Sequence, residues 1–180
     1  MSELAHIIDQ IRSEQGPGRE VPGLDPSNGN ENARILLVME APGPRAIASG
    51  FVSLDNDDLS AKNLRMQLEQ ANISRTELAL WNVVPWYLGN SEKTKIRSAR
   101  SSDVSKCLAY LTAVVGSLKK LEFIVLVGSA ARRAHVHLSH ETNVRILSCH
   151  HPSPRVQNTL SGAAEENVKV FIRTQRRDES

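Results

Sequence analysis

Residues 35–44 of the chain are Ile35-Leu36-Leu37-Val38-Met39-Glu40-Ala41-Pro42-Gly43-Pro44, and they are the strongest indication of its fold. Its first half is a continuous apolar run, as expected of a parallel strand that is covered on both faces. Its second half ends that strand abruptly, because two prolines and a glycine favour a turn. A buried strand followed at once by a carboxylate and a turn is typical of the ligand-binding edge of an open α/β sheet.

The rest of the chain alternates between predicted strands and predicted helices. Three further apolar runs predict strands, at residues 78–84, 123–127 and 144–148. Apolar residues at helical spacing predict helices at residues 3–14 and at about 163–173, and a short helix after Gly128. Two more helices are predicted between these: one from a cap at Asp58 or Ser60 to about residue 72, and one from a cap at Ser102 or Asp103 to about residue 118. This alternation favours a parallel sheet with helices on both faces. We therefore expect an α/β fold, with three layers (α/β/α) and a central four-stranded parallel sheet.

The length and composition predict one ordinary domain over residues 1–180. Residues 1–33 would form an N-terminal helix and a long loop, and the charged residues 174–180 would be a frayed tail. The hydrophobic fraction of 40% and the charged fraction of 23% are close to globular averages. No apolar run is long enough to span a membrane, and the first residues lack the features of a secretory signal. We expect a cytoplasmic monomer that does not bind membranes.

Charge is distributed unevenly along the chain. Residues 1–80 hold 7 Lys/Arg and 12 Asp/Glu, whereas residues 81–180 hold 15 and 8, which gives net charges of −5 and +7. A basic half can follow a phosphate backbone, although most charged stretches are simply solvated surface.

Two polar residues interrupt or end buried strands. Glu40 follows the first strand directly, and such a desolvated carboxylate is uncommon outside functional sites. It could instead cap a neighbouring helix or pair with Arg45. Asn82 lies in an otherwise apolar strand, and its amide needs partners for two donors and an acceptor. Such an amide could read the edge of a nucleobase, or it could hold a neighbouring loop.

The most specific segment is Cys149-His150-His151-Pro152-Ser153-Pro154-Arg155. Two prolines separated by one small residue predict a rigid protruding loop rather than a helix. His151 could donate a hydrogen bond to an anion that forms in a transition state, and Arg155 could reach a phosphate or enter a base stack.

Together these segments resemble the uracil-DNA glycosylase superfamily. Glu40-Ala41-Pro42-Gly43 resembles the first motif of its thermostable bacterial and archaeal branch, and His151-Pro152-Ser153-Pro154 is similar to the late motif. Asn82-Val83-Val84 and Gly50-Phe51-Val52 also resemble segments of that branch, and Ser153-Pro154-Arg155 looks more like the single-strand-selective enzymes. The resemblance covers about residues 33–158 and implies a uracil-DNA glycosylase-like fold.

The resemblance implies a DNA glycosylase of base excision repair, which hydrolyses the N-glycosidic bond of a flipped-out uracil or related deaminated base. Glu40 would orient or deprotonate water, Asn82 would read the base edge, and His151 would stabilise the leaving base. The base-binding residues implied are Ala41, Phe51, Asn82 and His151. The DNA-binding residues implied are Pro42, Gly43, Ser129, Pro152, Ser153, Pro154 and Arg155, with phosphate contacts from Lys93, Lys95, Arg97 and Arg100.

The same branch holds an iron–sulfur cluster on four cysteines, whereas this chain has only Cys107 and Cys149. Only Cys107 falls at a matching place, and Pro85 and Trp86 replace a basic and cysteine-bearing continuation. We therefore expect no iron–sulfur cluster, no metal and no other cofactor. The partner expected is DNA that contains uracil or another deaminated base.

Several alternatives stay open. The chain could be a non-catalytic DNA-binding or nucleotide-binding member of the same fold, or a glycosylase for hypoxanthine or xanthine. His135, His137 and His140 are metal-ligand types, but their spacing is irregular for one helix face. A dinucleotide-binding enzyme is disfavoured, because the first strand is not followed by a three-glycine fingerprint.

Overall fold

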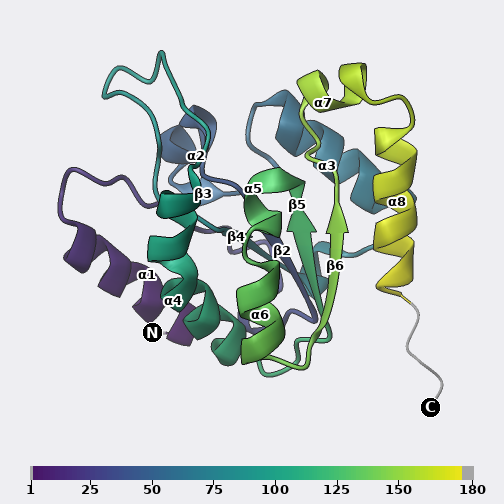
Figure 1. Ribbon diagram of the computed structural model, residues 1–180, viewed down its shortest axis with the longest axis horizontal. Coiled ribbons are helices and arrows are strands. Elements are labelled where there is room, and N and C mark those ends of the chain that lie inside the picture. The colour runs from purple at the N-terminus through teal and green to yellow at the C-terminus, as the bar shows by residue number, and fades with distance from the viewer. Residues whose placement is uncertain (1, 176–180) are drawn as a thin grey trace.

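The computed structural model describes residues 2–175, and its centre is a parallel four-stranded sheet (Figure 1). The strand order is β4-β2-β5-β6. The strands are β2 (Ile35–Met39), β4 (Leu78–Asn82), β5 (Phe123–Val127) and β6 (Arg145–Cys149). Because β2 and β5 are central, their residues are buried on both faces, which explains the continuous apolar runs in their sequences.

Helices cover both faces of this sheet, which confirms the predicted three-layer α/β fold. One face carries α1 (Glu3–Gln15), α4 (Ser101–Ser117), α5 (Gly128–Arg132) and α6 (His135–Glu141). The other face carries α3 (Leu59–Gln70) and α8 (Ala163–Arg173). Alternate residues of β2 serve the two layers: Leu36 packs in the first core cluster and Leu37 in the second.

The helix predictions hold to within a few residues at their ends. Asp58 caps α3, and its side chain accepts a hydrogen bond from the backbone N–H of Ala61 at 2.8 Å. The helix α4 begins at Ser101, slightly before the predicted cap at Ser102 or Asp103.

Two short helices occupy stretches that were predicted to be turns or loops. They are α2 (Pro44–Ser49) and α7 (Pro154–Thr159), and each begins at a proline. The prediction of a non-helical loop through Pro154 is wrong, because proline is well suited to the first helical position, where no N–H is needed. Ser153 caps α7 by accepting a hydrogen bond from the N–H of Val156. An unpredicted pair of short parallel strands also forms: β1 (Gly23–Leu24) lies in the long N-terminal loop, and its partner β3 (Phe51–Val52) follows α2.

Two strand ends differ from prediction, and both changes matter for the site. β4 stops at Asn82 rather than at residue 84, although the N–H groups of Val83 and Val84 still donate to the carbonyls of Met39 and Glu40. β6 ends one residue later than predicted, at Cys149.

The frayed tail predicted from residue 174 is wrong for the first two of its residues. Thr174 is fully buried, and its carbonyl accepts a hydrogen bond from Nη1 of Arg34 at 2.6 Å. Gln175 donates to the carbonyls of Ala71 and Asn72, so α8 is tied to the end of α3. Residues 176–180 lie outside the described part of the chain. None of the described helices has the length and apolar character needed to cross a bilayer.

Candidate functional site

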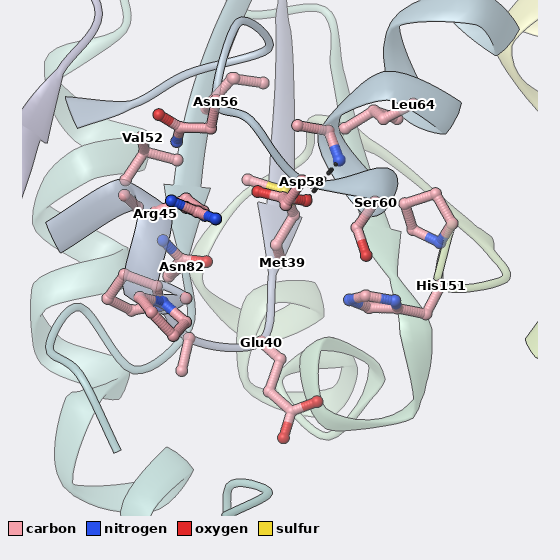
Figure 2. Close-up of a pocket in the computed structure, with 18 of the residues that line it drawn as sticks. Met39, Glu40, Arg45, Val52, Asn56, Asp58, Ser60, Leu64, Asn82 and His151 are labelled. Atoms are coloured by element: carbon pink, nitrogen blue, oxygen red, sulfur yellow. Dashed lines mark hydrogen bonds between the residues drawn. The ribbon is translucent and has the colours of Figure 1, made fainter. Parts of the chain in front are cut away.

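A pocket of about 520 Å³ opens at the C-terminal edge of the sheet. Glu40, Asn82 and His151 all line it, although they are far apart in the sequence. The register of the sheet explains the first pair, because Met39 lies beside Asn82 and Glu40 comes next. Figure 2 shows Asn82 and His151 on opposite sides of Met39, with Glu40 below them.

The Asn82 amide is the most informative group in this pocket. The residue is only 4% exposed, and it sits at the end of a strand that is otherwise apolar. Within residues 2–175, its side chain makes no hydrogen bond to the protein. A buried amide normally has partners for its polar atoms, so these donors and the acceptor are free to serve a ligand or water.

His151 enters the pocket from beyond β6, and its tautomer is fixed by its own loop. Its Nδ1 accepts a hydrogen bond from the backbone N–H of Ser153 at 3.1 Å. Nδ1 therefore carries no proton, and in the neutral ring the proton is on Nε2. Burial lowers the pKa of His151, while the charges of Glu40 and Asp58 act in the opposite direction. The result is a neutral ring that offers an N–H donor.

Gly128 explains how His151 reaches the pocket from an edge strand. It directly follows β5, as the first residue of α5, with φ +86°, a conformation that favours glycine. A Cβ at this position would lie 3.1 Å from the Cβ of His151. This positioning role is not predicted from the sequence, in which a glycine directly after a strand is the signal for it.

Glu40 combines a structural bond with an accessible position. Its Oε1 accepts a hydrogen bond from the backbone N–H of Ala99, just before α4, at 2.6 Å. Ala99 precedes Arg100, the N-cap of α4, so Glu40 holds the loop before this helix and does not cap it. Among the described residues, no ion pair joins Glu40 to Arg45. The carboxylate also lines the pocket, which leaves the second oxygen available for chemistry.

A buried polar cluster, which the sequence does not predict, fixes the backbone that leads to His151. The Asn167 side chain accepts from the N–H of His150 at 2.8 Å and donates to its carbonyl at 3.0 Å. The same amide donates to Gln67 of α3 at 3.0 Å. In addition, Asn63 donates to the carbonyl of Pro152 at 2.8 Å. Helices α3 and α8 thus hold both sides of the His-Pro segment.

Phe51 and Ser129 are among the predicted site residues that do not line the pocket. Phe51 is 42% exposed and packs beside Gly23, whereas its neighbour Val52 lines the pocket. Successive strand residues face opposite ways, so β3 can turn only one of these two side chains inward. The placement of Phe51 as a stacking platform is therefore wrong in this structure. Ser129 is exposed at the start of α5 and does not line the pocket.

The remaining predicted residues surround the opening. Those that line the pocket are Ala41, Pro42, Gly43, Pro152 and Arg155. Ser153 and Pro154 instead form the cap and first residue of α7. Of the basic residues expected to contact phosphates, Lys93 pairs with Glu20 and Arg97 pairs with Asp103. The Arg97 guanidinium lowers the pKa of Asp103 to about 2.

The cysteines do not fit an iron–sulfur cluster. Cys107 lies in the core on the α4 side of the sheet, and Cys149 lies in the core on the α3 side. Burial raises the pKa of each thiol to about 12, so neither is a ready thiolate ligand. Trp86 packs in the same cluster as Cys107, with the Arg19 guanidinium 5.0 Å from its ring centre.

The histidines of α6 give no support to a metal site. His137 shares a hydrogen bond of 2.7 Å with the Thr112 hydroxyl. Across residues 2–175, no group of three or more His, Cys, Asp or Glu side chains is placed to hold a metal ion.

The fold and pocket define an α/β protein whose ligand crevice lies beyond the C-terminal ends of its parallel strands. The family model described as the uracil DNA glycosylase superfamily matches residues 26–174. The chain belongs to this superfamily. A solution NMR structure from Methanosarcina acetivorans, provisionally described as a uracil DNA glycosylase, is similar at 16% identity. That match has a TM-score of 0.49 and covers 85% of this chain and 94% of the other. No curated protein matches this sequence.

Proposed function

We propose that this chain is a monofunctional DNA glycosylase, which hydrolyses the N-glycosidic bond of a flipped-out uracil or related deaminated base. The observation that carries the proposal is the buried Asn82 amide, which has no hydrogen-bond partner in the described protein and faces a pocket shared with Glu40 and His151. Family membership supports the reaction class.

Base recognition would depend on Asn82. An amide offers a donor and an acceptor side by side, which complements the O4 and N3–H edge of uracil. Cytosine presents the reverse pattern at these two positions, so the amide rejects cytosine only in the orientation that donates to O4, and an amide turned by 180° would pair with cytosine instead. Flipping costs a few kcal/mol and is easiest at mispaired bases, which favours uracil opposite guanine.

His151 would stabilise the departing base. As the glycosidic bond breaks, negative charge grows on the base, and a fixed N–H donor near O2 lowers the energy of that state. The hydrogen bond from Ser153 to Nδ1 sets Nε2 as the donor before substrate arrives. A neutral donor avoids a proton transfer, and the backbone near Ala41 could add further N–H groups.

Glu40 would serve the sugar side of the reaction. Positive charge develops on the sugar as the base leaves, and a nearby carboxylate both offsets this charge and orients the attacking water. The bond from Ala99 to Oε1 would fix the carboxylate while Oε2 contacts the water. We propose that these steps need no metal or other cofactor.

The test is a panel of labelled oligonucleotides with uracil, hypoxanthine or xanthine, each in single and double strands. Alkali treatment would cleave any abasic site, and chromatography would identify the released base. We expect release of uracil, with the mispaired duplex as the best duplex substrate. Release of hypoxanthine or xanthine alone would change the substrate, and binding without release from any strand would make the chain a non-catalytic DNA-binding member.

A further inference from the structure

The short helix α5 contacts three segments that position Glu40 and His151. It contacts β2, which ends just before Glu40, and β6, which ends two residues before His151. It also contacts α4, which begins two residues after Ala99, the backbone partner of Glu40. In Figure 1, α5 lies at the carboxyl end of β5, with α4 on one side and β6 on the other. This helix is therefore placed to fix the two candidate catalytic groups relative to each other.

Two adjacent arginines at the end of α5 donate hydrogen bonds to the backbone of these segments. Arg133, which follows the helix, donates from Nη1 to the carbonyl of Ala99 at 2.7 Å. Arg132, the last residue of the helix, donates from Nη2 to the carbonyl of Cys149 at 2.9 Å. Among residues 2–175, neither guanidinium forms an ion pair with a carboxylate. Both arginines therefore bind backbone carbonyls rather than acids.

The Arg133 contact leads directly to Glu40. Ala99 is only 4% exposed, and it lies in the loop before α4, outside any helix or strand. Its N–H donates to Oε1 of Glu40 and its carbonyl accepts from Arg133, so side chains hold this one residue from two directions. A charged donor makes a stronger hydrogen bond than a neutral one. Loss of Arg133 would release the carbonyl of Ala99, and the N–H that orients Glu40 would move with it.

The Arg132 contact serves His151 in the same way. Cys149 ends β6, which is an edge strand, and His151 enters the pocket two residues later. Arg132 holds the carbonyl of Cys149, while Gly128, the first residue of the same helix, lies against the His151 side chain. The two ends of α5 thus contact the segment that carries the imidazole.

We propose that these arginines are positioning residues with separate targets. Arg133 holds the Glu40 carboxylate through Ala99, and Arg132 holds the His151 ring through the carbonyl of Cys149. A displacement of about 1 Å in a reacting group can cost up to about 10²-fold in rate, so contacts of this kind affect the chemical step. The inference rests on the proposed function for this effect on rate, whereas the contacts themselves do not depend on it.

The test is a pair of double-mutant cycles. Arg133→Gln and Arg132→Gln are each made in the parent, in Glu40→Gln and in His151→Gln. Single-turnover release is measured at saturating protein on DNA with uracil opposite guanine, so that differences in affinity do not enter. Two residues that act as a unit have non-additive effects, whereas independent residues have additive ones. Both arginines are exposed, so their variants keep the fold.

Arg34→Gln is the control for a loss that is only structural. Arg34 also donates to a backbone carbonyl, that of Thr174 at 2.6 Å, and it does not line the pocket. Its variant should lose stability in urea and still release base at the parent rate.

We expect Arg133→Gln to lower release by about tenfold in the parent and in His151→Gln, but by less than about twofold in Glu40→Gln. Arg132→Gln should show the opposite pattern, with its effect lost in His151→Gln and kept in Glu40→Gln. Equal effects of either arginine in all three backgrounds, or no effect in the parent, would overturn its positioning role.

Amide hydrogen exchange of Ala99, followed by NMR, tests the Arg133 contact without any reaction. Exchange should be faster in Arg133→Gln, because the N–H bond to Glu40 is loosened, and should stay at the parent rate in Arg132→Gln. Unchanged exchange in Arg133→Gln would overturn the link to Glu40. If the parent releases no base but Ala99 responds in this way, the contact stands and the glycosylase proposal does not.

Discussion

Two buried amides near the same edge of the sheet have opposite surroundings. Asn167 is 1% exposed, and its side chain is hydrogen-bonded to the backbone of His150 and to Gln67. Asn82 is 4% exposed, and within the described chain its side chain has no such partner. The Asn167 amide stabilises and positions the structure around it, whereas the Asn82 amide lines the pocket and is open to water or a ligand there.

The largest effect should come from changing the open amide. Asn82→Asp removes the donor that would bind the O4 of uracil and adds a charge that repels it, so uracil release should fall by about 10³-fold or more. Single-turnover assays would measure this, with a cytosine-containing strand included to detect a change in base choice. Uracil release at the parent rate would show that the base is read elsewhere.

The next effect should come from the carboxylate. Glu40→Gln keeps an oxygen that can accept the Ala99 N–H but loses the charge, so single-turnover release should fall by on the order of 10²-fold or more while DNA binding is retained. Glu77→Gln is a control for the loss of a carboxylate away from the pocket: Glu77 accepts the Ser74 N–H and also pairs with Arg34, so its variant should lose stability but release base at the parent rate. If release by Glu40→Gln equals that of the control, Glu40 has no part in the chemistry.

Truncating each amide should separate their roles. Asn167→Ala leaves Gln67 and the His150 backbone unpaired, and the free energy of unfolding should fall by about 1–3 kcal/mol. Asn82→Ala should cost less stability, because its amide has no bond to lose. Urea unfolding of both variants measures the difference. Equal destabilisation would mean that Asn82 has a structural role after all.

A smaller effect should come from Gly128→Ala, which tests whether the small size of Gly128 positions the His151 side chain in the pocket. The new Cβ would press on His151 from a strained backbone, and release should fall by about tenfold. DNA affinity should be unchanged, and the His151 ring signals should shift in NMR spectra. Gly116→Ala is the control, since that glycine has open space around its Cβ position. Parent-like release and unshifted signals would remove Gly128 from the site.

The smallest effect concerns pH. Burial lowers the pKa of His151 in the folded state, so below about pH 6.5 the unfolded chain binds the proton more readily. The parent should therefore lose stability as pH falls from about 6.5 towards the lowered pKa, and His151→Gln should lose less. Urea unfolding at about pH 7.5 and 5.5 compares them. A parallel loss in both proteins would contradict the neutral ring.

The sheet and its helices were predictable because burial on both faces produces unbroken apolar runs. The apolar run before Glu40 and the apolar run that begins at Phe123 form the two central strands. The helices that begin at Pro44 and Pro154 were missed, because a proline that ends one element can also begin the next.

The site was predictable where it depends on strand ends and was not where it depends on side-chain direction. Glu40 and Asn82 followed from adjacent parallel strands. The outward direction of the Phe51 side chain depends on how β1 pairs with β3, and both strands are too short to show an alternating pattern in the sequence. The hydrogen-bond partners of Asn167 lie 17 and 100 residues away in the sequence, so no local sequence pattern predicts these contacts.

A crystal structure of Glu40→Gln bound to DNA that contains a uracil–guanine mispair would show directly whether Asn82 reads the base. We predict an everted uracil in the pocket, with its O4 and N3 within hydrogen-bond distance of the Asn82 amide and its O2 close to Nε2 of His151. A uracil that stays stacked in the duplex, or that binds away from Asn82, would contradict the account.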